Sequence, residues 1–145
     1  RSNYIINKIE RLFSINQNFR LDKSFNNIKS LEKSEILITD NSSIVFEFIF
    51  VFKRPVIYID YKEKIHNTDR DKIELPTIEE EFKKIFGNVI HANNLKNLPD
   101  LCEKLVVNRG ISDEEIDSFI KKYLSNIGNS AVFAANYLNK KSKSI

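Results

Sequence analysis

The stretch that decides the fold is ILITDNSSIVFEFIFVFKRPVIYID, residues 36–60. Its two ends, 36–39 and 56–59, are short runs dominated by β-branched residues and leucine, typical of strands buried on both faces of a parallel sheet. The segment 44–52 between them is apolar except for one glutamate, and it predicts a helix covered on most sides. Pro55 prevents that helix from continuing into the second strand. Strand, helix and strand in this order are the pattern of a parallel α/β layer.

The remaining chain continues the alternation of helix and strand. A Ser or Thr followed three residues later by Glu marks two helix starts, at Thr77 and at Ser112. Gly87 ends the first of these helices. In full, the sequence predicts helices at 3–13, 27–33, 77–86, 98–107, 113–124 and 130–139, and further short strands at 18–22 and 89–90. The predicted fold class is α/β, a Rossmann-like parallel sheet with flanking helices.

Length and charge restrict the class of protein. A chain of 145 residues suits one domain. We expect residues 1–138 to form it, and the polar, basic residues 139–145 to be a solvated tail. The net charge of +3 comes without a basic stripe interleaved with exposed aromatic residues, so nucleic acid is not an expected partner.

The cysteine content and the lengths of the apolar stretches indicate a location. The single cysteine, Cys102, excludes an internal disulfide and suits a reducing compartment, so we expect a cytoplasmic protein. No apolar stretch reaches the ~18 residues that a transmembrane span needs. A peripheral place at the inner face of the cell membrane stays open as an alternative, through the basic tail or through parts of the protein outside this chain.

Five small polar residues separate the apolar segments of the opening stretch: Thr39, Asp40, Asn41, Ser42 and Ser43. Ligands of open parallel sheets bind outside the carboxyl ends of the strands, where loops lead into helices. Residues 40–43 occupy that place. Ser42 or Ser43 can cap the helix, and the free N–H groups of its first turn form a site for an anion such as a diphosphate. The alternative is that the turn only caps a helix.

Glu47 is the one charge in the apolar helix that follows this turn. It lies four residues after Ser43, and hence on the same helical face. A buried carboxylate needs a partner, and the hydroxyls of a ribose would serve. The alternative is that Glu47 touches water and is favoured there by the helix dipole.

The two histidines, His66 and His91, each come after a predicted strand. Both therefore belong at the same edge of the sheet as Asp40. A surface role is the simpler alternative for His66 and for the acidic residues of its loop, 61–76. The sequence holds no cluster of Cys and His with the spacing of metal ligands, so no metal and no cofactor are expected.

The stretch 36–60 resembles the C-terminal signature of the CDP-glycerol glycerophosphotransferase-like enzymes. In that signature a strand runs into Thr-Asp-x-Ser-Ser, and an aromatic-acid-aromatic helix and a Pro-Val/Ile strand follow. Further segments similar to the family are FRLDKSFNNIKSLEKSE upstream, and KIHN, EEEFKKIFG and GNSAVFAANYL downstream. The likeness covers about residues 18–138.

The resemblance implies a GT-B architecture, which has two facing Rossmann-like domains, with this chain as the C-terminal, donor-binding one. It implies transfer of glycerol phosphate, or a related group, from CDP-glycerol to a cell-envelope or capsular polymer, on a polymer or lipid-linked acceptor. By position, the donor diphosphate would be bound by Asp40, Asn41, Ser42 and Ser43. Glu47 and His66 would bind the ribose or another part of the donor.

The sequence also departs from the family pattern. The upstream His-Pro motif and the catalytic histidine of the N-terminal domain are not in this sequence, and Asn41 stands where the family commonly has an aromatic residue. We therefore expect a piece of a longer protein that lacks its first strand–helix unit. Its general base would lie outside this chain, so the chain alone would be inactive.

Two other functions fit the same residues. A sugar-nucleotide-dependent glycosyltransferase of GT-B type would use the same turn for its donor. A non-catalytic interaction module would use no donor at all. A phosphoacceptor signalling domain is disfavoured, because no acidic pair precedes Asp40.

Overall fold

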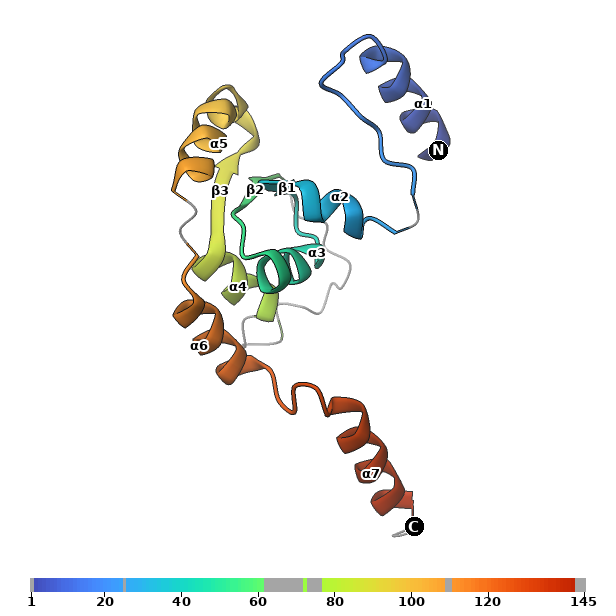
Figure 1. Cartoon of the computed structure of the whole chain (residues 1–145), viewed down its shortest axis with the longest axis vertical. Coiled ribbons are helices and arrows are strands. Elements are labelled where there is room, and N and C mark those ends of the chain that lie inside the picture. The colour runs from blue at the N-terminus through green and yellow to red at the C-terminus, as the bar shows by residue number, and fades with distance from the viewer. Residues whose placement is uncertain (1, 25, 62–71, 73–76, 109–110, 143–145) are drawn as a thin grey trace. The chain divides into compact units, whose positions relative to one another are not determined.

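The structure, a computed structural model, describes residues 2–24, 26–61, 72, 77–108 and 111–142. Contacts divide the chain into two compact units, Arg1–Ser34 and Glu35–Ile145. Each unit is described by itself, and the elements of both are labelled in Figure 1. The sheet belongs to the second unit.

The sheet has three parallel strands in the order β1-β2-β3. The strands are β1 (Leu37–Thr39), β2 (Val56–Asp60) and β3 (Gly87–His91). Thr39 pairs with Tyr58, and Tyr58 pairs in turn with Val89. The predicted α/β class with a parallel sheet is confirmed, and the third strand is longer than predicted.

The burial of the strands differs from the prediction in β1. In β2, Val56 and Ile57 are 0% exposed, as a strand with neighbours on both sides should be. In β1, Ile38 is 43% exposed, so the prediction of burial on both faces is wrong for this strand. The physical reason is that β1 is an edge strand of the described sheet, and a neighbour pairs with it on one side only.

Helices connect and follow the strands of the second unit. They are α3 (Ile44–Glu47), α4 (Ile78–Phe86), α5 (Leu98–Val107), α6 (Asp113–Tyr123) and α7 (Ser130–Ser142). A π-helical turn, Phe48–Phe52, continues α3, and a 3-10 helix, Ala92–Asn97, precedes α5. The π-helical turn ends at Lys53, which adopts a left-handed conformation (φ 53°) before Pro55.

Aromatic side chains hold α3, α4 and α6 together. Phe82 of α4 is 0% exposed. Its ring lies 4.4 Å from that of Phe46, 5.5 Å from that of Phe50 and 5.0 Å from that of Phe119. Such ring pairs add to the apolar burial that stabilises the core. The segment 44–52, predicted to be covered on most sides, buries Val45, Phe48 and Ile49, and it exposes Val51 by 64%.

The two predicted capping boxes are confirmed. The Thr77 hydroxyl accepts a hydrogen bond from the Glu80 N–H (3.3 Å), and the Glu80 carboxylate accepts one from the Thr77 N–H (3.1 Å). Ser112 and Glu115 make the same reciprocal pair at the start of α6. These bonds satisfy N–H groups that a helix start leaves without a partner. Gly87 follows α4 as predicted, on extended backbone, and the position requires glycine because a Cβ there would clash with the carbonyl oxygen of Lys83.

The first unit contains α1 (Ser2–Phe13) and α2 (Ile28–Lys33), as predicted. The strand predicted at 18–22 is wrong, because these residues form a turn and an irregular segment. Local hydrogen bonds explain the difference. The Asn16 side chain accepts a bond from the Asn18 N–H, and Asp22 accepts one from the Ser24 N–H. Such bonds give the backbone an alternative to a sheet ladder.

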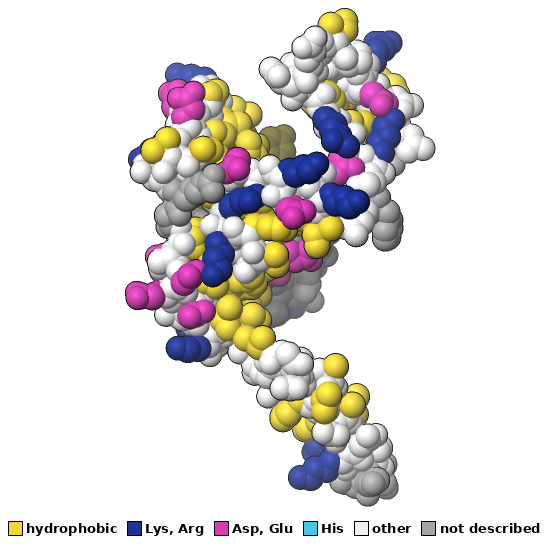
Figure 2. Space-filling model, viewed as in Figure 1, with side chains coloured by type: hydrophobic (Ala, Val, Ile, Leu, Met, Phe, Trp, Pro, Cys, Tyr) yellow, Lys and Arg dark blue, Asp and Glu magenta, His cyan; other side chains and the backbone are white. Residues whose placement is uncertain are grey.

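The last helix, α7, extends three residues beyond its predicted end at 139. Residues 139–142, predicted as part of a tail, are therefore helical, and they are exposed. Figure 2 shows apolar side chains along α7. Of the apolar residues of this helix, Phe133, Tyr137 and Leu138 are 55–65% exposed.

Candidate functional site

The carboxyl ends of the three strands lie at one edge of the sheet, because the strands are parallel. The turn 40–43 follows β1, Asp60 ends β2 and His91 ends β3. Asp60 and His91 are register partners. This is the edge at which ligands of open α/β sheets bind.

The turn 40–43 presents its polar groups outward. Asp40, Asn41 and Ser43 are exposed, and Ser42 is half-buried. Ser43 occupies the N-cap position of α3, but its hydroxyl makes no cap hydrogen bond, so the predicted capping role of Ser43 is wrong. The reason is conformational: Ser43 has helical angles (φ −65°, ψ −14°), whereas a capping side chain normally sits on extended backbone.

The backbone of this turn tightens the start of α3. The N–H groups of Val45 and Phe46 bond to the carbonyl oxygens of Ser42 and Ser43, at 3.4 and 3.1 Å. The N–H groups before them belong to the first turn, which an α-helix leaves without an intrahelical partner. The start of α3 can therefore offer N–H donors and serine hydroxyls to an anion.

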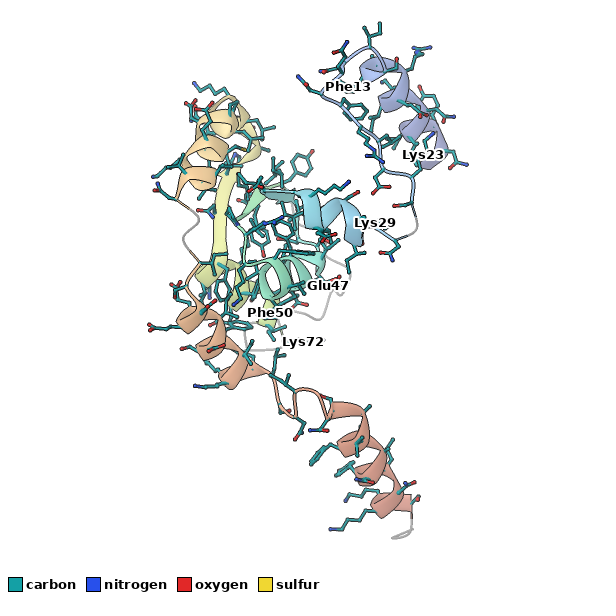
Figure 3. All side chains as sticks on the ribbon, in the orientation of Figure 1. Phe13, Lys23, Lys29, Glu47, Phe50 and Lys72 are labelled. Carbon is teal, nitrogen blue, oxygen red and sulfur yellow. The ribbon has the colours of Figure 1, made fainter. Side chains whose placement is uncertain are left out.

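Glu47 is exposed, one helical turn after Ser43 (Figure 3). Within the described residues its carboxylate makes no hydrogen bond or ion pair. The premise that Glu47 is a buried charge in need of a partner is therefore wrong, since water can solvate it. Its exposure leaves the carboxylate accessible to a ligand, and its role as a donor-binding residue stays a prediction.

Lys83 is a residue of this edge that the sequence did not single out. It belongs to α4, and its side chain is 23% exposed. Its Nζ lies 3.4 Å from Oδ1 of Asn41 and 3.7 Å from Oδ1 of Asp60. The ammonium therefore reaches both the turn after β1 and the end of β2.

The ammonium of Lys83 lies near a buried tyrosine. Tyr58 is 3% exposed, and burial raises the pKa of its hydroxyl to about 12. The Lys83 Nζ lies 5.4 Å from the centre of the Tyr58 ring, within the range of a cation–π contact. The ammonium of Lys83 therefore faces a neutral aromatic ring as well as the Asp60 carboxylate.

The sequence contains a signal for one of these neighbours. The rule that pointed to Asp40, a polar residue directly after a buried strand, applies equally to Asp60. Lys83 gives no such signal, because a lysine in the last turn of a helix is typical of a solvated position. Only the packing of α4 shows where its ammonium lies.

The histidines do not complete this group. His91 is exposed, and its Nδ1 accepts a hydrogen bond from the Asn93 N–H (3.2 Å). It shares the edge with Asp40, as predicted, but β2 separates the two strands by about 10 Å in total. His66 and the acidic residues of the loop 61–76 lie outside the described residues. Among the residues described, no three His, Cys, Asp or Glu come together as metal ligands would.

Two cavities among the described residues lie elsewhere. The larger, about 400 Å³, is lined by residues of α4 and α6, including Ile85, Phe119 and Tyr123. The smaller, about 150 Å³, includes Pro55 and Gly87, at the amino ends of β2 and β3. Neither is lined by a predicted site residue.

A parallel α/β layer with a polar turn at the carboxyl edge defines a class of ligand-binding proteins that often accept phosphorylated ligands there. A family model narrows this class: the CDP-Glycerol:Poly(glycerophosphate) glycerophosphotransferase family matches residues 2–125. The chain belongs to this family. Membership supports a transferase role with CDP-glycerol as donor and a polymer as acceptor.

Other comparisons add no further relatives. Neither the curated proteins nor the solved structures contain a significant match to the chain. Over the part of the chain that the structure describes, no helix is both long and apolar enough to cross a membrane.

Proposed function

We propose that this chain binds the donor nucleotide of a transferase that moves glycerol phosphate, or a related group, from CDP-glycerol to a cell-envelope or capsular polymer. The observation that carries the proposal is the family match over residues 2–125, which includes the whole sheet. The chain would be the C-terminal, donor-binding domain of a GT-B enzyme.

The donor diphosphate would be bound by Asp40, Asn41, Ser42 and Ser43, with Glu47 and His66 at the ribose or another part of the donor. The position of the turn supports this assignment, because it lies at the carboxyl end of β1 and opens α3. Serine hydroxyls and the N–H groups of the first turn are neutral donors that suit phosphate oxygens. Since Asp40 itself would repel a phosphate, its role would be to orient the turn or to accept a ligand hydroxyl.

The reaction would proceed by displacement at phosphorus. An acceptor hydroxyl oxygen forms a bond to the β-phosphorus of CDP-glycerol, and the bond from that phosphorus to the bridging oxygen breaks. CMP leaves with the bridging oxygen, and the hydroxyl proton passes to a general base, which we expect outside this chain. The donors at 42–44 would stabilise the negative charge that develops on the leaving phosphate.

Nucleotide titrations test the proposal. The 145-residue chain should bind CDP and CDP-glycerol in calorimetric or NMR titrations, and it should bind UDP and UDP-sugars more weakly. It should release no CMP when CDP-glycerol and a polymer acceptor are supplied, since the base would be absent. Preference for UDP-sugars would instead favour a sugar-nucleotide-dependent glycosyltransferase. No nucleotide binding at all would favour a non-catalytic interaction module.

A further inference from the structure

Lys83 differs from the other lysine beside it in what surrounds it. Lys84 is 68% exposed and pairs with Glu81 at 3.1 Å, three residues away on the same helix. Lys83 is 23% exposed, and its contacts come from two other elements of the sheet unit. The two lysines are therefore adjacent in sequence, but Lys84 contacts its own helix and Lys83 contacts the carboxyl edge of the sheet.

The contacts of Lys83 position its ammonium without saturating it. The distance to the Asp60 carboxylate is 3.7 Å, which is long for a hydrogen-bonded ion pair. The distance to the amide oxygen of Asn41 is 3.4 Å, also at the long end for a hydrogen bond. An ammonium has three donors, so with these two contacts among the described residues it can still donate a hydrogen bond to an anionic ligand.

The surroundings of Lys83 also restrict where its ammonium can go. The ring of Tyr58 lies 5.4 Å from the Nζ, and Tyr58 is itself held in the middle strand of the sheet. A partly buried stem loses less side-chain freedom when a ligand arrives than an exposed one does. The ammonium is thus held beside Asn41, a residue of the turn that we propose binds the donor.

We propose that Lys83 is a phosphate-binding residue of the donor site, whose ammonium contacts the phosphate oxygens of a nucleoside diphosphate. This inference rests on the proposed function and adds the cation that the turn 40–43 lacks. Without it, the described edge would offer a diphosphate neutral donors beside the carboxylates of Asp40 and Asp60. Lys83 supplies the positive charge that offsets this repulsion.

A series of ligands with increasing phosphate content tests the inference. Cytidine, CMP and CDP are titrated by NMR against the wild-type chain, Lys83→Met and Lys84→Met. Methionine keeps an unbranched apolar stem beside Tyr58 and removes the charge. In Lys83→Met, affinity for CDP should fall about 10- to 100-fold, the range for one lost hydrogen bond to a charged group, while affinity for cytidine stays within about twofold. Lys84→Met, the matched control, should bind all three as the wild type does.

Three outcomes would overturn the inference. Wild-type CDP affinity in Lys83→Met would show that the ammonium does not touch phosphate. An equal loss for cytidine and CDP, with a lower melting temperature, would make Lys83 a structural residue that supports the turn. In both cases binding of CDP by the wild type would leave the proposed function standing. If the wild type bound no CDP, the proposed function and this inference would fail together.

Discussion

Two segments of this chain combine an aspartate and serines at the start of a helix. Their side chains form different hydrogen bonds. In the turn before α2, the Asp22 carboxylate accepts hydrogen bonds from the Ser24 N–H and hydroxyl and from the Ser30 hydroxyl. In the turn before α3, the hydroxyls of Ser42 and Ser43 make no hydrogen bond within the described residues. The first turn satisfies its own aspartate, whereas within the described residues the two serine hydroxyls of the second turn have no partner.

The starts of α4 and α6 sharpen the same contrast. Thr77 and Ser112 lie on extended backbone and use their hydroxyls in capping boxes. Ser43 lies on helical backbone and does not. Similar residues therefore cap the helix at two starts, and at the third the serine makes no cap hydrogen bond. This third start is the one at the carboxyl edge of the sheet, where we propose that the donor binds.

The largest expected effect concerns ligand binding by the open turn. Replacement of both Ser42 and Ser43 by alanine should lower CDP affinity by about 1.5–3 kcal/mol for each hydrogen bond to a charged phosphate that is lost. The free energy of unfolding should change little, because Ser43 makes no cap hydrogen bond. Titration with CDP beside thermal melts of the same variant measures both. A lower melting temperature with wild-type CDP affinity would make the turn a helix cap after all.

The next effect is a loss of stability without a loss of binding, and we expect it at the start of α4, where the Thr77 hydroxyl does make a cap hydrogen bond. Thr77→Ala should lower the free energy of unfolding by about 1 kcal/mol, because it removes the hydrogen bond from the Glu80 N–H. It should leave CDP affinity unchanged. Denaturant unfolding of Thr77→Ala and of Ser43→Ala, run in parallel, compares the two positions directly. Equal destabilisation of both variants would contradict the finding that Thr77 makes a cap hydrogen bond and Ser43 does not.

The fold was largely predictable, because it depends on local patterns. The apolar runs around 36–60 identify two strands and the helix between them, and the capping boxes at Thr77 and Ser112 mark two more helices. The exposure of Ile38 was not predictable, because nothing in the local sequence tells an edge strand from a central one. The strand predicted at 18–22 is wrong because the side chains of Asn16 and Asp22 bond to nearby backbone N–H groups, which competes with the hydrogen bonds of a sheet.

The candidate site was predictable only in part. The rule for parallel sheets identified the turn 40–43, since it needs only the order of strand and helix. Lys83 could not be found this way, because it lies 42 positions after Asn41 and only the packing of α4 brings them together. The conformation of Ser43 also required the structure, since the same residue type caps a helix when its backbone is extended.

A smaller effect on binding is expected at Glu47, next to the open turn. Glu47→Gln should weaken CDP binding less than the serine replacements do, because an amide oxygen still accepts a hydrogen bond from a ribose hydroxyl. Stability should not change, since the carboxylate is exposed. Titration with CDP and with 2′-deoxy-CDP tests the assignment to ribose. If Glu47→Gln lowered affinity for both nucleotides equally, Glu47 would not contact the 2′-hydroxyl.

The smallest effect is a pH dependence of stability that arises from Asp22, in the turn before α2. Hydrogen bonds from Ser24, and then from Ser30, lower the pKa of Asp22 from 3.8 to about 2. Because these bonds favour the charged form in the folded state, their stabilisation is present above pH 4 and is lost as the pH falls toward 2. The Asp22 carboxyl should titrate near pH 2 by NMR, and Ser30→Ala should raise its pKa toward the ordinary value. The carboxylate is exposed, so water screens it and the effect on stability should be small. An ordinary Asp22 pKa in the wild type would mean that the serines do not donate hydrogen bonds to this carboxylate in solution. The contrast between this turn and the turn 40–43 would then be wrong.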